Sequence, residues 1–313
     1  MSFTTEIKTE LLNLPLVNDC CILARLSACI STIGSIEPSP LGITFSLRSD
    51  NTKLLKNVQE IINKVYSEKI ETAVLSTEVV GKHTMYEMQV PRSLGQQILK
   101  DCGIIYIGEN NSININFGID HHIIMADCCK KIYLQTVLIT VGQVSLPTKT
   151  SGYHFELELT SNEEAKAVSS LLGEFGFFAR KVERGGKFLV YLKEGEAIAD
   201  LLAFLGATKS YLKLTDEIVK RDMRNSINRQ SNCNMANINK TVSSALNQVK
   251  AIENISETVG LDSLSDKLKQ TAELRLNNPE LSLNELVELC EGKFTKSGLN
   301  YNLNKLLEIS KNL

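Results

Sequence analysis

Hydrophobic and polar positions in the first two thirds of the chain follow one pattern that occurs twice. In each copy, an apolar helix-like segment precedes two alternating strand-like runs, a second helix, two further strands and a last helix. The copies open with "DCCILARLSACISTIGSI" and "DCCKKIYLQTVLITVGQV", at an offset of 108 residues. A repeat this long indicates a duplicated domain, because solenoid repeats have periods of about 20–50 residues.

The pattern predicts an α+β fold in which an αββαββα unit is used twice, over about residues 19–106 and 127–207. The first helix of each copy carries a stripe of small side chains at helical spacing. Such stripes let two helix backbones approach closely, so we expect these helices to pack on each other across a pseudo-twofold axis. The stripe comprises Ala24, Ser27, Ala28 and Ser31 in the first copy and Thr136 and Thr140 in the second.

After Asn254 the pattern becomes entirely helical. Two segments, "LDSLSDKLKQTAELRLNN" and "SLNELVELC", are followed by the glycine-containing turn "EGKFT" and a last helix, "KSGLNYNLNKLLEIS". Ser263 with Asp266, and Ser282 with Glu285, have the spacing of capping boxes. Two short helices joined by a tight turn and supported by a third are typical of a helix-turn-helix, so this end of the chain is predicted to be an all-α helix-turn-helix domain.

The last helix has an apolar stripe of Leu299, Leu303 and Leu306 and a polar face opposite to it. Asparagine binds adenine bidentately in the major groove, and lysine or serine reaches guanine or phosphate, so this face is a candidate DNA-reading surface. The same pattern is typical of a solvated helix in a protein–protein module, and the residues alone leave both interpretations open. The candidate DNA-binding residues here are Lys293, Lys296, Ser297, Asn300, Tyr301, Asn304 and Lys305.

The stretch between the two regions, residues 220–258, is basic and rich in asparagine, and it has no carboxylate between Asp222 and Glu253. Asparagine is a poor helix former, so its abundance needs another reason. Contact with DNA phosphates is one explanation, because carboxylates would be repelled there. An amide network that braces the domain junction is the other. If the stretch is helical, Asn225, Asn228, Arg229 and Asn232 share one face. The candidate phosphate-binding residues are Arg221, Arg224, Asn228, Arg229 and Lys240.

Composition adds a localised charge to this picture. The chain has 313 residues and a net charge of −2, yet residues 220–250 contain six basic residues and one acidic residue. Such asymmetry indicates a nucleic-acid surface near the C-terminal end. The opening "MSFTTEIKTELL" places charged side chains where a signal peptide needs an apolar core, and no apolar run has the length of a membrane span. We therefore expect a cytoplasmic, nucleoid-associated protein with no membrane partner.

The eight cysteines include two adjacent pairs, Cys20-Cys21 and Cys128-Cys129. Adjacent cysteines lack the C-x-x-C spacing of a zinc site, and cytosolic thiols stay reduced. The interpretation is therefore buried thiols, with neither a metal nor a cofactor expected.

A duplicated αββαββα unit whose leading helix ends in glycine resembles the LAGLIDADG homing-endonuclease fold. The resemblance implies that an acid just before that glycine holds the metal ions that cut DNA. Here Ile33 and Val141 occupy the two positions, and no acid occurs between Lys131 and Phe155. Alkyl groups cannot hold hard cations, so we expect no catalytic residues and no metal there. A residual metal-dependent nuclease is kept as the enzyme alternative.

The run "FELELT" predicts a strand with Phe155, Leu157 and Leu159 toward the core and Glu156 and Glu158 outward. In the endonucleases the corresponding saddle binds DNA, and carboxylates there would repel phosphates. The first domain is therefore interpreted as a regulatory body that binds a protein or small ligand, with a bare scaffold as the other interpretation.

Four runs are similar to signature runs of the bacterial WhiA family, and "MSFTTEIKTELL" resembles that family's opening. They are "LKEGEAIADLLAFLGA", "MRNSINRQSNCNMANINKTVSSAL", "AELRLNNPELSLNELVEL" and "KSGLNYNLNKLLEI". The resemblance covers essentially the whole chain. It implies a LAGLIDADG-like body without nuclease residues and a C-terminal helix-turn-helix, in DNA-binding transcriptional regulators linked to sporulation in filamentous actinobacteria and to cell division or chromosome organisation in other Gram-positive bacteria.

These patterns predict a duplicated LAGLIDADG-like domain over residues 1–219, a basic linker helix over 220–258 and a helix-turn-helix domain over 259–313. The expected function is regulation of cell division or chromosome organisation, because richness in Asn, Ile and Lys indicates an AT-rich genome rather than an actinobacterial one. Double-stranded DNA is the expected partner, with another regulatory protein as a second candidate. Asn302 and Asn304 stand where the family often has arginine, which favours as an alternative a protein-binding adaptor with weak DNA affinity.

Overall fold

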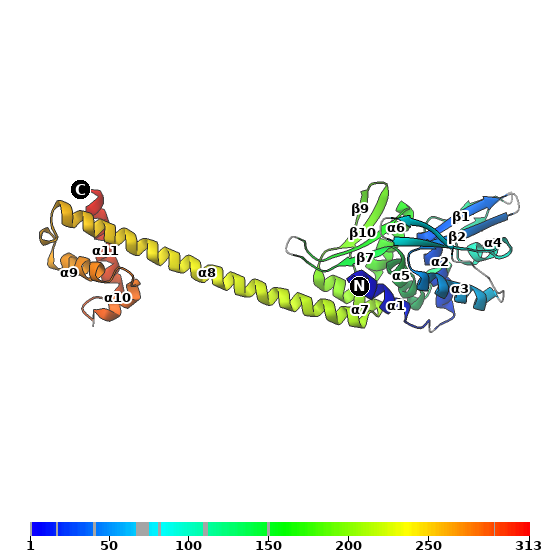
Figure 1. Cartoon of the computed structure of the whole chain (residues 1–313), viewed down its shortest axis with the longest axis horizontal. Coiled ribbons are helices and arrows are strands. Elements are labelled where there is room, and N and C mark those ends of the chain that lie inside the picture. The colour runs from blue at the N-terminus through cyan, green and yellow to red at the C-terminus, as the bar shows by residue number, and fades with distance from the viewer. Residues whose placement is uncertain are drawn as a thin grey trace. The chain divides into compact units, whose positions relative to one another are not determined.

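The computed structural model of the chain is shown in Figure 1. It describes residues 2–16, 18–39, 42–66, 75–80, 83–108, 112–148, 151–290 and 292–313. Two compact units divide the chain, Met1–Lys220 and Arg221–Leu313.

The first unit contains the αββαββα order twice, which confirms the predicted duplication. The first copy consists of α2 (Cys20–Ile33), β1 (Gly34–Ser39), β2 (Gly42–Ser49), α3 (Thr52–Tyr66), β3 (Leu75–Val80), β4 (His83–Gln89) and α4 (Arg92–Asp101). The second consists of α5 (Asp127–Val141), β7 (Gly142–Ser145), β8 (His154–Leu159), α6 (Asn162–Glu174), β9 (Arg180–Arg184), β10 (Lys187–Leu192) and α7 (Gly195–Leu205). Helix α1 (Phe3–Leu12) precedes both copies, and β5 (Ile105–Ile107), β6 (Ile113–Ile115) and the 3₁₀ helix η2 (His121–Ile124) lie between them.

Each copy builds one antiparallel four-stranded sheet of the same topology. The strand orders are β1-β2-β4-β3 and β7-β8-β10-β9. On β8, the side chains of Phe155, Leu157 and Leu159 are buried in the core, as their alternation predicts, while Glu156 and Glu158 lie on the other face. Period-two alternation therefore sets which face of this sheet packs on the core.

Helices α2 and α5 lie side by side and make the most extensive contact between any two elements in the described part of the chain (Figure 1). Ala24, Ala28 and Thr136 are fully buried, and the hydroxyl groups of Ser31 and Tyr133 hydrogen-bond across the helix pair at 3.0 Å. The prediction that the small-residue stripes bring these helices together is confirmed. This packing joins the two copies into one core.

A glycine ends each of these helices because the chain turns directly into a strand there. A Cβ atom added at Gly34 would lie 2.3 Å from the carbonyl oxygen of Ile30, and one at Gly142 would lie 2.6 Å from that of Leu138. Neither position has room for a side chain.

The second unit is helical and has a core of its own. Helix α8 (Thr208–Thr258) begins in the first unit and is followed by the 3₁₀ helix η3 (Leu261–Ser263), α9 (Asp266–Asn277), α10 (Leu283–Leu289) and α11 (Lys296–Lys311). The core comprises Ile252, Ile255, Leu268, Ala272, Leu286, Leu299, Leu303 and Leu306. The predicted leucine stripe of the last helix is therefore confirmed.

Of the two capping boxes read from the sequence, one forms. The hydroxyl of Ser282 accepts from the backbone N–H of Glu285, whose carboxylate accepts in return from the N–H of Ser282. The box at Ser263 is wrong, because Ser263 lies in η3 and α9 starts only after Ser265. Spacing alone cannot distinguish a cap from a short 3₁₀ turn.

None of the helices in the described ranges combines the length and apolar character that crossing a membrane requires. All eight cysteines are free thiols. The expectation that the paired ones are buried is wrong for Cys20, which is exposed, and for Cys128, which is half-buried.

Candidate nucleic-acid interface

The segment from α10 to α11 has the local structure of a helix-turn-helix. Helix α10 starts at the Ser282 capping box, and Gly292 in the following turn has φ of 87°, a left-handed conformation that favours glycine. Thr295 caps the start of α11, and its hydroxyl accepts from the backbone N–H of Gly298 at 3.1 Å. Caps and turn therefore set where the last helix begins.

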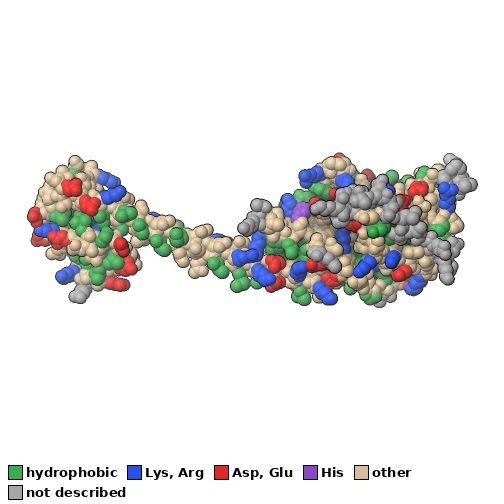
Figure 2. Space-filling view, in the orientation of Figure 1, with side chains coloured by type: hydrophobic (Ala, Val, Ile, Leu, Met, Phe, Trp, Pro, Cys, Tyr) green, Lys and Arg blue, Asp and Glu red, His purple; other side chains and the backbone are tan. Residues whose placement is uncertain are grey.

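Helix α11 presents its candidate residues on the side opposite to its buried leucines. Leu299, Leu303 and Leu306 are buried in the core of the second unit. The seven exposed candidates are Lys293, Lys296, Ser297, Asn300, Tyr301, Asn304 and Lys305. At about 100° of rotation per residue, those on the helix share one broad face. The side of this unit that is visible in Figure 2 carries both basic and acidic side chains.

Asn302 lies outside this face. Its side-chain amide donates to the hydroxyl oxygen of Thr271 on α9 at 3.0 Å, and the residue is half-buried. Asn302 therefore joins α11 to α9, whereas Asn304 is exposed on the candidate face.

Arg275 on α9 was not singled out by its sequence context, yet it shapes this module. Its side chain is 2% exposed and donates from Nη1 to the carbonyl oxygens of Asn278 at 3.3 Å and Leu281 at 2.6 Å. Burial lowers the pKa of its guanidinium. Arg275 therefore holds the loop that leads from α9 into α10, and its role is structural.

The asparagine-rich stretch forms part of α8, which is helical through residues 208–258. Arg224, Asn228, Arg229 and Lys240 are exposed, and Arg221 is half-buried. The Nε atom of Arg229 donates to the carbonyl oxygen of Asn225 at 3.3 Å, a contact within the helix. The middle of α8 carries no acidic side chain, since none occurs between Asp222 and Glu253 (Figure 2).

Sequence reasoning missed an apolar stripe on α8. Met223, Ile227 and Ile238 are exposed, and the helical rotation places them roughly opposite Asn225, Asn228 and Arg229. Their spacing of four and eleven residues was visible in the sequence but was obscured by the surrounding asparagines.

In the first unit, Ile33 and Val141 are the last helical residues of α2 and α5, and both are half-buried against the core. An acidic residue that the sequence did not indicate, Glu164 on α6, lies near the end of α2. It lines a cavity of 340 Å³ together with Ser31 and Gly34. Glu164 is 2% exposed, and burial raises its pKa, partly offset by a hydrogen bond from Ser31. A single buried carboxyl group with a raised pKa is a poor ligand for a hard cation.

Glu164 is far from Gly34 and Gly142 in sequence, because it lies on a different helix, α6, so the residues next to these glycines do not indicate it. The spacing of Ser161 and Glu164 marks the start of α6, and the hydroxyl of Ser161 does accept from the backbone N–H of Glu164. That signal locates a helix start but says nothing about which side chain becomes buried.

Replacing Glu164 with glutamine is expected to raise stability at neutral pH, by on the order of 1 kcal/mol. A carboxyl whose folded-state pKa is raised stabilises the fold only while it is protonated, so this contribution is lost as pH rises from the ordinary carboxyl range through the folded-state pKa. Thermal unfolding of both proteins between mildly acidic and neutral pH measures the difference.

The matched control is Glu163→Gln on the neighbouring exposed residue. Hydrogen bonds from its own backbone N–H and from Ser161 lower the pKa of Glu163, so its contribution is present at neutral pH and is lost on acidification. A Glu164→Gln advantage that stays constant across this pH range contradicts the assignment of a raised pKa.

The outward carboxylates of β8 have partners on their own strand and on β10. Glu156 pairs with the Nε2 atom of His154 at 2.9 Å, and Glu158 forms an ion pair with Lys187. Arg180 and Arg184 are exposed on the adjoining strand β9. This face is therefore less negative than the two glutamates alone suggest.

Three family models match the chain. They are the WhiA N-terminal LAGLIDADG-like domain over residues 19–105, the WhiA LAGLIDADG-like domain over 130–224 and the WhiA C-terminal HTH domain over 227–310. Relatives from Oceanobacillus iheyensis (strain DSM 14371) and Bacillus subtilis (strain 168), each named probable cell division protein WhiA, are 36% identical over all of this chain and 98% and 97% of their own lengths.

The crystal structure of full-length DUF199/WhiA from Thermatoga maritima superposes on the chain with a TM-score of 0.57 and 21% identity, covering 100% of this chain and 99% of the other. That likeness shows a shared fold. Because the family models match both repeats and the helix-turn-helix, and the relatives align over the whole length, this chain belongs to the WhiA family.

Proposed function

We propose that this chain is a DNA-binding transcriptional regulator that acts in cell division or chromosome organisation and associates with the nucleoid. The observation that carries the proposal is the exposed polar face of α11, which begins directly after a capped helix and a glycine turn. In helix-turn-helix proteins the first turns of the second helix read base edges in the major groove, and here they contain Lys296, Ser297 and Asn300. The relatives are named probable cell division protein, which supports the part of the proposal that concerns cell division.

Chromatin immunoprecipitation with sequencing in the source bacterium is the direct experiment, followed by binding of the full chain to the recovered fragments. We expect those fragments to bind at least about 10³-fold more tightly than unrelated duplexes of equal length. Equal affinity for both kinds of duplex contradicts sequence-specific regulation.

In this proposal residues 1–219 form the body, 220–258 contact phosphates and 259–313 read the bases. Replacing Arg229 and Lys240 with alanine is expected to weaken binding to all sequences equally and to lower the slope of log K against log salt by about 2, because each lost phosphate contact removes about 0.9. Fluorescence anisotropy across a salt series measures the slope.

The control for that pair is Lys53→Ala with Lys56→Ala, two exposed lysines of α3 in the body. The control is expected to keep the parental slope. An unchanged slope in the Arg229/Lys240 variant favours the other interpretation of the asparagine-rich stretch, an amide network at the domain junction.

We further propose that the body is not an enzyme. The alkyl side chains of Ile33 and Val141 supply no metal ligands, and the buried Glu164 is a single carboxyl with a raised pKa. Incubation of the full chain with supercoiled DNA and Mg²⁺ is expected to leave the DNA intact. Nicking that persists through independent preparations, and is lost in Glu164→Gln, refutes this part of the proposal.

A second function, docking of another regulatory protein, is favoured by the exposed Met223, Ile227 and Ile238 on α8. Apolar docking is nearly independent of salt, whereas phosphate contact is not. The salt series therefore distinguishes an adaptor from a DNA-binding helix.

A further inference from the structure

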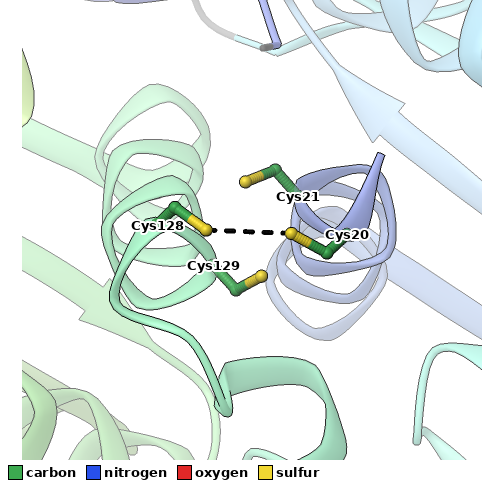
Figure 3. A group of neighbouring side chains, drawn as sticks. All are labelled: Cys20, Cys21, Cys128 and Cys129. Atoms are coloured by element: carbon green, nitrogen blue, oxygen red, sulfur yellow. Dashed lines mark hydrogen bonds between the residues drawn. The ribbon is translucent and has the colours of Figure 1, made fainter. Parts of the chain in front are cut away.

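Two adjacent cysteine pairs lie at the first turns of the central helices of the body. Cys20 and Cys21 begin α2, and Cys128 and Cys129 lie in the first turn of α5. Because α2 and α5 pack on each other, residues 108 positions apart become neighbours, with 3.7 Å between the Sγ atoms of Cys20 and Cys128. All four Sγ atoms lie within 4.8 Å of one another. Figure 3 shows the pairs on facing helices, with their sulfur atoms in the space between them.

We propose that Cys20, Cys21, Cys128 and Cys129 form a tetrahedral thiolate site for a soft divalent cation, Zn²⁺. A zinc–sulfur bond of about 2.3 Å places tetrahedral sulfur atoms about 3.8 Å apart. The Cys20 and Cys128 sulfur atoms are 3.7 Å apart and no two of the four are more than 4.8 Å apart, so small side-chain rotations complete the geometry. Four sulfur ligands in this arrangement select zinc over the hard cations of nuclease sites.

A disulfide explains the cluster less well. Its sulfur atoms must approach to about 2.05 Å, and a single bridge uses only two of the four thiols. A metal ion uses all four.

The surroundings offset the negative charge that such a site carries. Four thiolates around Zn²⁺ have a net charge of −2, and the N-terminal ends of two helices stabilise negative charge. Arg25, one turn along α2 from Cys21, is 1% exposed, and its charge lies close enough to Cys21 and Cys29 to interact with them. Its Nε and Nη2 atoms have no hydrogen-bond partner within the described ranges, and Nη1 donates to the side-chain oxygen of Asn57 at 3.2 Å. A buried guanidinium without a carboxylate is accounted for by a nearby anionic cluster.

Access also fits a site that loads from solvent. Cys20 is exposed and Cys128 half-buried, whereas Cys21 and Cys129 are buried. Zinc binds cysteine in the thiolate form, so zinc uptake releases thiol protons to the solvent as the Zn–S bonds form.

The expected consequence is a clamp between the two repeats. The cation would join the first turns of α2 and α5, at the opposite end of these helices from Gly34 and Gly142. Because the four ligands come together only in the folded body, zinc stabilises the folded state over the unfolded one.

The test uses the full-length chain under reducing conditions. Titration with Zn²⁺ against a chromophoric chelator is expected to give one tight site per chain, and Co²⁺ is expected to give the intense visible absorption of a tetrahedral cobalt thiolate. Replacing Cys20 and Cys128 together with serine should weaken zinc by more than the about 10–100-fold that loss of an outer-shell partner costs. The control, Cys233→Ser, changes an exposed cysteine on α8 outside the cluster and should leave binding unchanged.

Three results overturn the proposal. The first is a parental chain that binds neither Zn²⁺ nor Co²⁺ with thiolate absorption. The second is a correctly folded double variant, as judged by circular dichroism, that binds zinc as tightly as the parent. The third is a chain isolated from cells with Cys20 and Cys128 quantitatively joined as a disulfide. If the double variant does not fold, the cobalt spectrum of the parental chain is the test: tetrahedral thiolate absorption supports the site, and its absence overturns it.

Discussion

Replacing Lys296 and Asn300 together with alanine is expected to weaken specific DNA binding by more than about tenfold, because each well-formed base contact contributes about 1–3 kcal/mol of discrimination. Both side chains are exposed on the first two turns of α11, where a helix-turn-helix meets base edges. Neither residue belongs to the core of the second unit, so the unfolding temperature should not change. Gel shifts or anisotropy with fragments recovered by immunoprecipitation measure the loss.

Lys311→Ala is the matched control for this surface. Lys311 is also exposed on α11, but it lies in the last turn of the helix, away from the end that enters a groove. It should retain nearly parental affinity. If both variants bind as tightly as the parent, the assignment of α11 to the major groove is wrong, and the docking of a protein becomes the better account of the exposed face.

Replacing Leu303 with alanine is expected to destabilise the second unit by about 2–5 kcal/mol, the range for a buried leucine that leaves a cavity. Leu303 is 1% exposed and packs in the small core that α8, α9, α10 and α11 share. A domain has only about 5–15 kcal/mol of stability in total, so this loss should lower the population of the folded module and DNA affinity with it. Chemical unfolding followed by circular dichroism measures the effect.

The comparison variant is Tyr301→Ala, two residues away on the same helix. Tyr301 is 66% exposed, so its removal should change stability by no more than about 0.5 kcal/mol while weakening DNA binding. Leu303→Ala thus reports on core packing, and Tyr301→Ala reports on DNA recognition. Because the core of the first unit contains no residue of α11, the Leu303 variant should keep the unfolding transition of the body. Loss of both transitions together contradicts the independence of the two cores.

The order of helices and strands was predictable because it rests on local periodicity. Alternation at Phe155, Leu157 and Leu159 placed β8 correctly, and the leucines of α11 marked its buried side. The duplication was predictable for the same reason, since two copies of one pattern at an offset of 108 residues require no knowledge of contacts.

Contacts between distant segments were not predictable in this way. The helical pattern left Asn302 off the candidate face, and only packing shows that its amide donates to the hydroxyl oxygen of Thr271. From the sequence, Glu164 is an acid in the first turn of a helix, a position that is usually exposed. In the structure it is buried and interacts with Ser31. In both cases a neighbour from another element, rather than the residue's own surroundings in sequence, decides the chemistry.

The amino-acid sequence by itself determined the duplicated body, the helix-turn-helix and the polar side of α11, because periodicity, capping residues and glycine turns act over a few residues. The tertiary structure alone decided that the two cysteine pairs form one cluster, that Arg275 holds the α9–α10 loop and that a lone carboxyl is buried behind Gly34. These features depend on which helices pack together, and the close approach of α2 and α5 converts a separation of 108 residues into 3.7 Å.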